Sequence, residues 1–154
     1  MLKVASFDIV FQEIPGEVTL ALNLSNCPCH CPGCHSQHLA EDIGEPLTEE
    51  LMDDLIGRYK GLITCVAFMG GDADPEEVAR WAEYVKAFRL KTAWYSGRMN
   101  MPKDEKAFDY VKLGPYIETL GGLKSEKTNQ RFYKREDDTW IDITASFQRK
   151  TFEI

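Results

Sequence analysis

With 154 residues, the chain has the length of one domain and enough material to bury a hydrophobic core without disulfide support. Its composition of 44% hydrophobic and 28% charged residues is typical of a soluble globular protein, and its net charge of -7 opposes non-specific binding to nucleic acid. Residues 1–10 lack the apolar core of a secretory signal, and the longest apolar stretch, Leu62–Met69, is too short to span a bilayer. A cytoplasmic protein is therefore expected.

Segments with the periodicity of strands alternate with segments of helical periodicity along most of the chain. The capping residues Thr48 and Asp74, the second followed by Pro75, mark two helix starts. The predicted strands are 17–24, 62–69, 92–95 and 110–113, and the predicted helices are 49–59, 75–88 and 104–110. Near the end of the chain, 131–135 and 139–144 flank Asp137-Asp138 and are predicted to form a hairpin.

This order of elements predicts an α/β fold with a largely parallel sheet. The chain is too short for a complete eightfold barrel of roughly 250 residues. We therefore expect a partial (β/α) barrel, TIM-like and open on one side, with a short hairpin-like tail at the C-terminus. The expected organisation is a single domain over 1–154, with a core of about 7–133 and a C-terminal extension of 134–154.

Four of the five cysteines lie within the eight residues Cys27-Pro-Cys-His-Cys-Pro-Gly-Cys34. An odd number of cysteines at this density is untypical of a disulfide framework and indicates metal or redox chemistry. With the spacing Cys27-x3-Cys31-x2-Cys34, three thiolates on one tight loop can hold three irons of a [4Fe–4S] cluster and leave the fourth iron open to another ligand. The strand before this loop would place the cluster at the carboxyl edge of a parallel sheet, where ligands bind in such folds.

Structural zinc is the alternative for the same loop. Three of these cysteines together with His30, His35 or His38 would make a tetrahedral Cys₃His site. Zinc ligands usually come as two separated pairs, whereas Cys65 stands alone and no histidine follows His38. The sequence favours an iron–sulfur cluster and leaves zinc open.

Two motifs together resemble those of the radical S-adenosylmethionine enzymes. The three-cysteine spacing follows the first predicted strand, and Gly70-Gly71-Asp72 ends the second. Over about 7–133, the small size of the chain, Trp94-Tyr-Ser-Gly97 and Asn129-Gln-Arg131 narrow the likeness to the activating proteins of anaerobic (class III) ribonucleoside-triphosphate reductases.

The resemblance implies a ligand set for the cluster. Cys27, Cys31 and Cys34 would ligate three irons, and the fourth iron would bind the amino and carboxylate groups of S-adenosylmethionine. Cys29 is an extra thiol inside the motif, either a passive variant or a competing ligand. Cys65, in an apolar predicted strand, is expected to be an inert core residue.

The resemblance also implies contacts to S-adenosylmethionine. Gly70-Gly71-Asp72 would meet the amino group of its methionyl part, where backbone carbonyls and a carboxylate suit an ammonium. Gly33 and His35, beside Cys34, would lie near the adenine, and Ser96 would meet the ribose.

The activity implied by the resemblance is reductive cleavage of S-adenosylmethionine to methionine and a 5′-deoxyadenosyl radical, which generates a glycyl radical on the anaerobic reductase. The implied partners are that reductase and reduced flavodoxin or a similar electron donor, with no nucleic acid and no membrane. Two other functions stay open: activation of another glycyl radical enzyme, of the pyruvate formate-lyase type, and a non-catalytic zinc-binding module for assembly.

Overall fold

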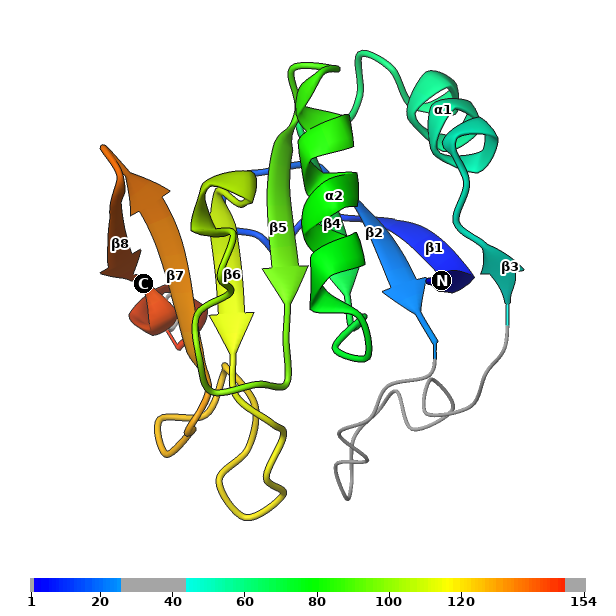
Figure 1. The fold of residues 1–154 in the computed structure, drawn as a ribbon. Coiled ribbons are helices and arrows are strands. Elements are labelled where there is room, and N and C mark those ends of the chain that lie inside the picture. Colours follow the sequence, from blue (N-terminus) through cyan, green and yellow to red (C-terminus); the bar gives the residue numbers. More distant parts are fainter. Residues whose placement is uncertain (1, 26–43, 149–154) are drawn as a thin grey trace.

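The computed structural model describes residues 2–25 and 44–148, and within these ranges eight strands pair into one sheet (Figure 1). The strands lie side by side in the order β3-β1-β2-β4-β5-β6-β7-β8. Their bounds are β1 (Lys3–Val10), β2 (Thr19–Leu24), β3 (Glu45–Pro46), β4 (Cys65–Met69), β5 (Lys91–Tyr95), β6 (Tyr110–Leu113), β7 (Arg131–Glu136) and β8 (Thr139–Asp142). The helical elements in these ranges are α1 (Glu49–Arg58), α2 (Pro75–Lys86) and the 3-10 helices η2 (Glu105–Ala107) and η3 (Thr144–Phe147).

The two α-helices begin where the sequence predicts. The side chain of Thr48 accepts a hydrogen bond from the Leu51 amide at 3.2 Å, and that of Asp74 accepts one from the Glu77 amide at 3.2 Å. The predicted helix at 104–110 is only the single turn η2. None of the helices in the described ranges has the length and apolar character needed to traverse a lipid bilayer.

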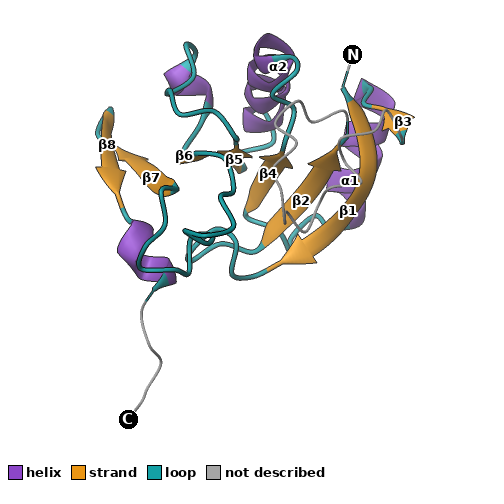
Figure 2. Ribbon diagram, turned by 90° about the horizontal axis from the view of Figure 1, so that it is seen from below, coloured by secondary structure: helices purple, strands orange, loops and turns teal. Residues whose placement is uncertain are grey.

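Alternate residues of the central strands face two separate hydrophobic cores, as period-two side chains must. The larger core lies between the sheet and both α-helices (Figure 2), and it unites Leu22 and Phe68 of the strands with Leu55 of α1 and Val78 of α2. The smaller core lies on the other face of the sheet around Phe132 and Ile14. The sheet is therefore covered by helices on one face and by loop segments and η3 on the other.

The predicted partial (β/α) barrel with a largely parallel sheet is wrong. Only the three pairings among β2, β4, β5 and β6 are parallel, whereas the four pairings that add β1, β3, β7 and β8 are antiparallel. Eight strands accompany two α-helices in the described part of the chain, so the fold is a mixed sheet. The prediction failed on both sides of the parallel strands, because β1 joins β2 antiparallel at one side and β7 joins β6 antiparallel at the other. Local periodicity does not reveal either pairing.

The strand β1 was not predicted, and a β-bulge accounts for this. The register with β2 shifts between Val4 and Ser6, so the strict alternation of side chains is broken there. As a result Val4, Phe7 and Ile9 all contact the larger core, although a regular strand would put the first on the opposite face from the other two.

The predicted hairpin near the C-terminus is confirmed as β7 and β8. Asp137 and Asp138 both have positive φ, 51° and 63°, as a two-residue turn of type I′ requires. The hairpin extends the sheet, because Arg131 pairs with Leu113 at the end of β6. The predicted division of the single domain into a core of about 7–133 and a C-terminal extension of 134–154 stays a prediction.

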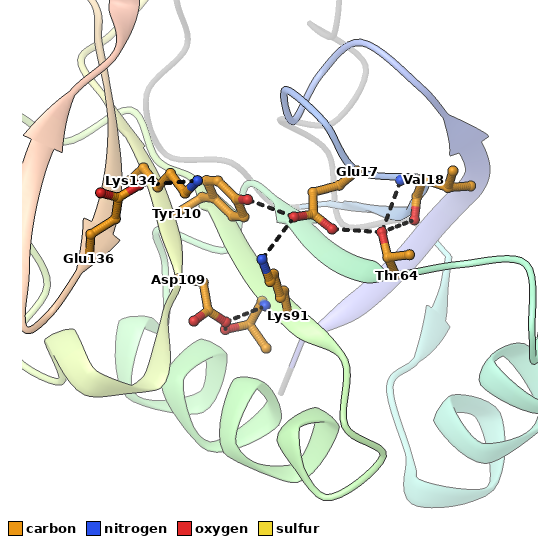
Figure 3. Close-up of polar contacts among 9 residues, drawn as sticks. Glu17, Val18, Thr64, Lys91, Asp109, Tyr110, Lys134 and Glu136 are labelled. Atoms are coloured by element: carbon orange, nitrogen blue, oxygen red, sulfur yellow. Dashed lines mark hydrogen bonds and ion pairs between the residues drawn. The ribbon is translucent and has the colours of Figure 1, made fainter.

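A buried carboxylate joins the amino-terminal ends of three central strands (Figure 3). Glu17, whose side chain is 8% exposed, accepts hydrogen bonds from Thr64 Oγ1 at 2.6 Å and from Tyr110 Oη at 2.6 Å, and Lys91 Nζ lies 3.3 Å away. Burial alone would raise the pKa of Glu17, but these three partners outweigh it and hold the pKa below its ordinary value of 4.5. This edge of the sheet is thus closed by a satisfied polar network.

We expect Glu17→Gln to destabilise the protein by about 1–3 kcal/mol at pH 7, because an amide presents N–H groups to partners that are themselves donors. Since the folded-state pKa is lowered, this stabilisation is complete above about pH 4.5 and is lost as the pH falls through the folded-state pKa. Urea unfolding at a series of pH values, with the exposed Glu118→Gln as control, measures the effect. A stability difference that does not narrow below pH 4.5 would contradict it.

Candidate functional site

The site predicted from the sequence lies at the carboxyl edge of the parallel strands, at the lower end of β2, β5 and β6 in Figure 1. Asn23, Met69, Tyr95 and Lys112 are neighbours in the strand register at this edge. It is opposite to the edge that Glu17 closes. Carboxyl ends of parallel strands are where ligands bind in open α/β sheets.

Gly70 and Gly71 turn the backbone sharply after β4. Their φ values of 103° and 87° are ones that residues with a side chain rarely adopt. A Cβ on Gly71 would lie 2.7 Å from Val78 Cγ2 and 2.9 Å from Leu24 Cδ1, so no larger residue fits there. The position of a Cβ on Gly70 is 3.2 Å from the carbonyl oxygen of Leu24, the last residue of β2. The two glycines therefore bring the turn after β4 into contact with the end of β2.

Asp72 and Ser96, two residues that the resemblance places at the ligand, lie together at this edge. Ser96 Oγ donates to Asp72 Oδ1 at 2.6 Å, and the Gly97 amide donates to Asp72 Oδ2 at 2.9 Å. Asp72 and Ser96 are each 1% exposed. The carboxylate of Asp72 is thus held by the segment that follows β5, and it ties the end of β4 to the end of β5.

Sequence reasoning missed two contacts of this turn. Trp94 Nε1 donates to the carbonyl oxygen of Gly70 at 2.6 Å, and Arg98 Nη2 donates to the carbonyl oxygen of Asp72 at 2.7 Å. Trp94 and Arg98 each lie two residues from Ser96 in the sequence. This proximity to a predicted site residue was the only signal that could have indicated their contacts with the turn. A carbonyl oxygen has two lone pairs, and each of these contacts uses one.

The end of β6 contributes a buried cation to the same edge. Lys112 is 9% exposed, its Nζ donates to the carbonyl oxygen of Gly114 at 3.1 Å, and it lies 5.6 Å from the ring centroid of Tyr95. Gln130 Nε2 donates to the same carbonyl at 3.3 Å. The predicted segment Asn129-Gln-Arg131 therefore packs against the turn after β6.

The predicted cluster ligands Cys27, Cys31 and Cys34, together with the predicted contact residues Gly33 and His35, lie outside the described residues. Both described residues that flank this segment lie at the carboxyl edge. Ser25 donates its amide to the carbonyl oxygen of Lys3 at 3.1 Å, and Gly44 lies against the backbone of Val4, the partner of Leu24 in the register. The described chain therefore ends before the cysteine segment beside Leu24, which the turn at Gly70 contacts, and it resumes at Gly44 on the β3 side of β1.

Cys65 lies at the other end of β4. It pairs with Thr19 and Lys91 at the starts of β2 and β5. Met69 lies four positions further along the strand, a distance of roughly 13 Å. It is fully buried, and burial raises the pKa of its thiol. A cysteine binds a metal ion as the thiolate, which burial disfavours at this position, so the expectation that Cys65 is an inert core residue fits its surroundings. Within the described ranges no three His, Cys, Asp or Glu residues gather as a metal site.

Comparison with known proteins supplies the remaining evidence. A family model described as "4Fe-4S single cluster domain" matches residues 15–111, which include the four clustered cysteines, Gly70-Gly71-Asp72 and Ser96. The chain belongs to this family. It is accordingly an iron–sulfur protein, and of the two metals that the cysteine loop allowed, the match favours iron–sulfur over zinc. No curated protein and no solved structure matches the chain.

The donors available fit a cluster bound at this edge. Of the five cysteines, Cys65 is excluded as a ligand by its burial at the opposite edge, which leaves the four thiols of the short segment that follows Ser25. Soft thiolates are the ligands that iron–sulfur clusters require.

We expect Ser96→Ala to lower the free energy of unfolding by about 1–3 kcal/mol, because the buried carboxylate of Asp72 loses a donor and the Arg98 amide loses its acceptor, Ser96 Oγ at 3.0 Å. Chemical unfolding under anaerobic conditions measures the change, and the exposed Ser146→Ala is the control. Equal stability of Ser96→Ala and Ser146→Ala would show that this contact does not hold the edge together.

Proposed function

We propose that this iron–sulfur protein is a radical S-adenosylmethionine activase that generates the glycyl radical of an anaerobic ribonucleoside-triphosphate reductase. The observation that carries the proposal is that two of the sequence motifs meet at the carboxyl edge of the sheet, where the described chain also breaks off before the cysteine segment. The turn Gly70-Gly71-Asp72 contacts the end of β2, Ser96 contacts Asp72, and Ser25, the last described residue before the cysteines, directly follows β2.

The cysteines of the spacing shared with radical S-adenosylmethionine enzymes would hold the cluster. Cys27, Cys31 and Cys34 would ligate three irons, so the fourth keeps an open position for the amino and carboxylate groups of S-adenosylmethionine. When both are bound and a donor has reduced the cluster, it would supply the one electron that cleaves the sulfonium carbon–sulfur bond into methionine and the 5′-deoxyadenosyl radical.

The remaining residues would bind and orient S-adenosylmethionine. Gly70 and Gly71 would give the backbone the turn that brings it to the ligand, because their positive φ values suit glycine and rarely other residues. Asp72 would act on the methionyl amino group through the shape and negative charge of the turn, since its carboxylate accepts hydrogen bonds from Ser96 and Gly97. Ser96 would lie by the ribose, with Gly33 and His35 near the adenine.

The protein partners follow from the same resemblance. The radical acts on a glycine of a large reductase, so that reductase is the macromolecular substrate, and reduced flavodoxin or a similar protein would donate the electron. The net charge of -7 gives no support for nucleic acid as a partner.

The cleavage reaction tests the proposal first. After anaerobic reconstitution we expect about four irons per chain, and dithionite with S-adenosylmethionine should release 5′-deoxyadenosine, measured by chromatography. Separate alanine variants of Cys27, Cys31 and Cys34 should lose this activity, because each removes one iron ligand.

Cys65→Ala is the matched control, since it removes a thiol that lies at the opposite edge of the sheet. It should keep the cluster and the cleavage activity. Reduced protein with a full iron content that releases no 5′-deoxyadenosine would overturn the activase proposal, and one zinc per chain without iron would point to an assembly module.

The identity of the partner needs a separate experiment. With the anaerobic ribonucleoside-triphosphate reductase of the same organism, the reduced protein and S-adenosylmethionine should produce a glycyl radical doublet in the electron paramagnetic resonance spectrum. A doublet formed only with a pyruvate formate-lyase-type enzyme would contradict this choice of partner while leaving the cleavage chemistry intact.

A further inference from the structure

Arg98 lies just after the end of β5, and its side chain reaches back to the turn after β4. Its Nη2 donates to the carbonyl oxygen of Asp72 at 2.7 Å, and its Nε lies 3.8 Å from Asp72 Oδ1. One guanidinium therefore contacts both the main chain and the carboxylate of the same residue. A planar group with several donors in a fixed arrangement suits this double contact.

The backbone of Arg98 is held independently of its side chain. Its amide donates to Ser96 Oγ at 3.0 Å, and its carbonyl oxygen accepts from the Gly114 amide at 2.7 Å. These two hydrogen bonds hold the backbone of Arg98 at the ends of β5 and β6. Its side chain then connects this position to the turn after β4. Three strand ends at the carboxyl edge are thus linked through one residue.

We propose that Arg98 is a positioning residue, which holds the turn Gly70-Gly71-Asp72 in the conformation that receives the methionyl group of S-adenosylmethionine. This inference rests on the proposed function and adds a residue to which the resemblance assigns no role. Removal of the guanidinium frees the carbonyl of Asp72, and the two glycines before it offer little resistance to rotation of the backbone.

Global stability is not the main contribution of this side chain. The Arg98 side chain is 53% exposed, and ion pairs at such exposure add little to folding. The carboxylate of Asp72 keeps its donors from Ser96 and Gly97 when Arg98 is replaced. The loss should therefore remain local to the turn.

The test compares Arg98→Met with Arg58→Met on the cluster-loaded protein. Methionine keeps an unbranched apolar side chain and removes every donor. Arg58 is a matched control, because its side chain is 54% exposed and it pairs with Asp54 at 2.7 Å on α1. Three quantities are measured: the KM for S-adenosylmethionine and kcat in reductive cleavage, the thermal midpoint, and hydrogen exchange by mass spectrometry without S-adenosylmethionine.

For Arg98→Met we expect a KM raised about tenfold or more, as found when groups that orient ligands are removed, with kcat changed far less. Exchange should accelerate in peptides that cover 70–74 and 96–98, where the amides of Asp74 and Gly97 are hydrogen-bonded within the turn and to Asp72. The thermal midpoint should match that of Arg58→Met. Arg98→Lys keeps the charge but not the double contact, so its KM should fall between those of wild type and Arg98→Met.

Unchanged exchange at 70–74 in Arg98→Met would overturn the positioning role, even with a raised KM, because the guanidinium would then act on S-adenosylmethionine directly. Faster exchange throughout the sheet, with a lower midpoint than Arg58→Met, would also overturn it. Failure of the activase proposal is distinguishable, since it would appear as no cleavage by the wild-type protein, whereas the exchange measurement needs no S-adenosylmethionine.

Discussion

The arrangement of the site depends on one buried carboxylate. Asp72 is 1% exposed and lies in the turn after β4. The groups that donate hydrogen bonds to its carboxylate belong to Ser96 and Gly97, which follow β5. A buried carboxylate without donors is costly, so the ends of these two strands must keep their relative position as long as the protein is folded. Because the turn before Asp72 also contacts the end of β2, the strand that leads into the cysteine segment is held at its carboxyl end.

The amino-terminal and carboxyl edges of the parallel strands differ in how their polar groups are arranged. At the amino-terminal edge, Glu17 is satisfied by Thr64, Tyr110 and Lys91, and this network closes the edge (Figure 3). At the carboxyl edge the glycines after β4 let the turn pack closely against Leu24 and Val78, and Arg98 is half exposed. The satisfied network closes one end of the strands, and the other end is the carboxyl edge, where open α/β sheets bind their ligands.

Much of this edge was predictable from local sequence, because caps, apolar runs and glycine turns are local signals. The starts of α1 and α2 and the strand at Tyr110–Leu113 were found, and the motifs at Asp72 and Ser96 do meet. The mixed sheet was missed because the partner of a strand is set by distant segments. The bulge in β1 concealed its alternation, and the reach of Arg98 back to β4 is a tertiary contact that spacing does not encode.

The central claim is that S-adenosylmethionine binds a cluster that has one iron without a protein ligand. The most direct measurement is electron–nuclear double resonance of the dithionite-reduced protein with S-adenosylmethionine labelled with ¹⁵N at the amino group. The account predicts a ¹⁵N coupling large enough to show direct coordination to iron, together with a change in the g-values of the cluster when S-adenosylmethionine is added. A spectrum that is identical with and without S-adenosylmethionine, with no ¹⁵N coupling, would contradict it.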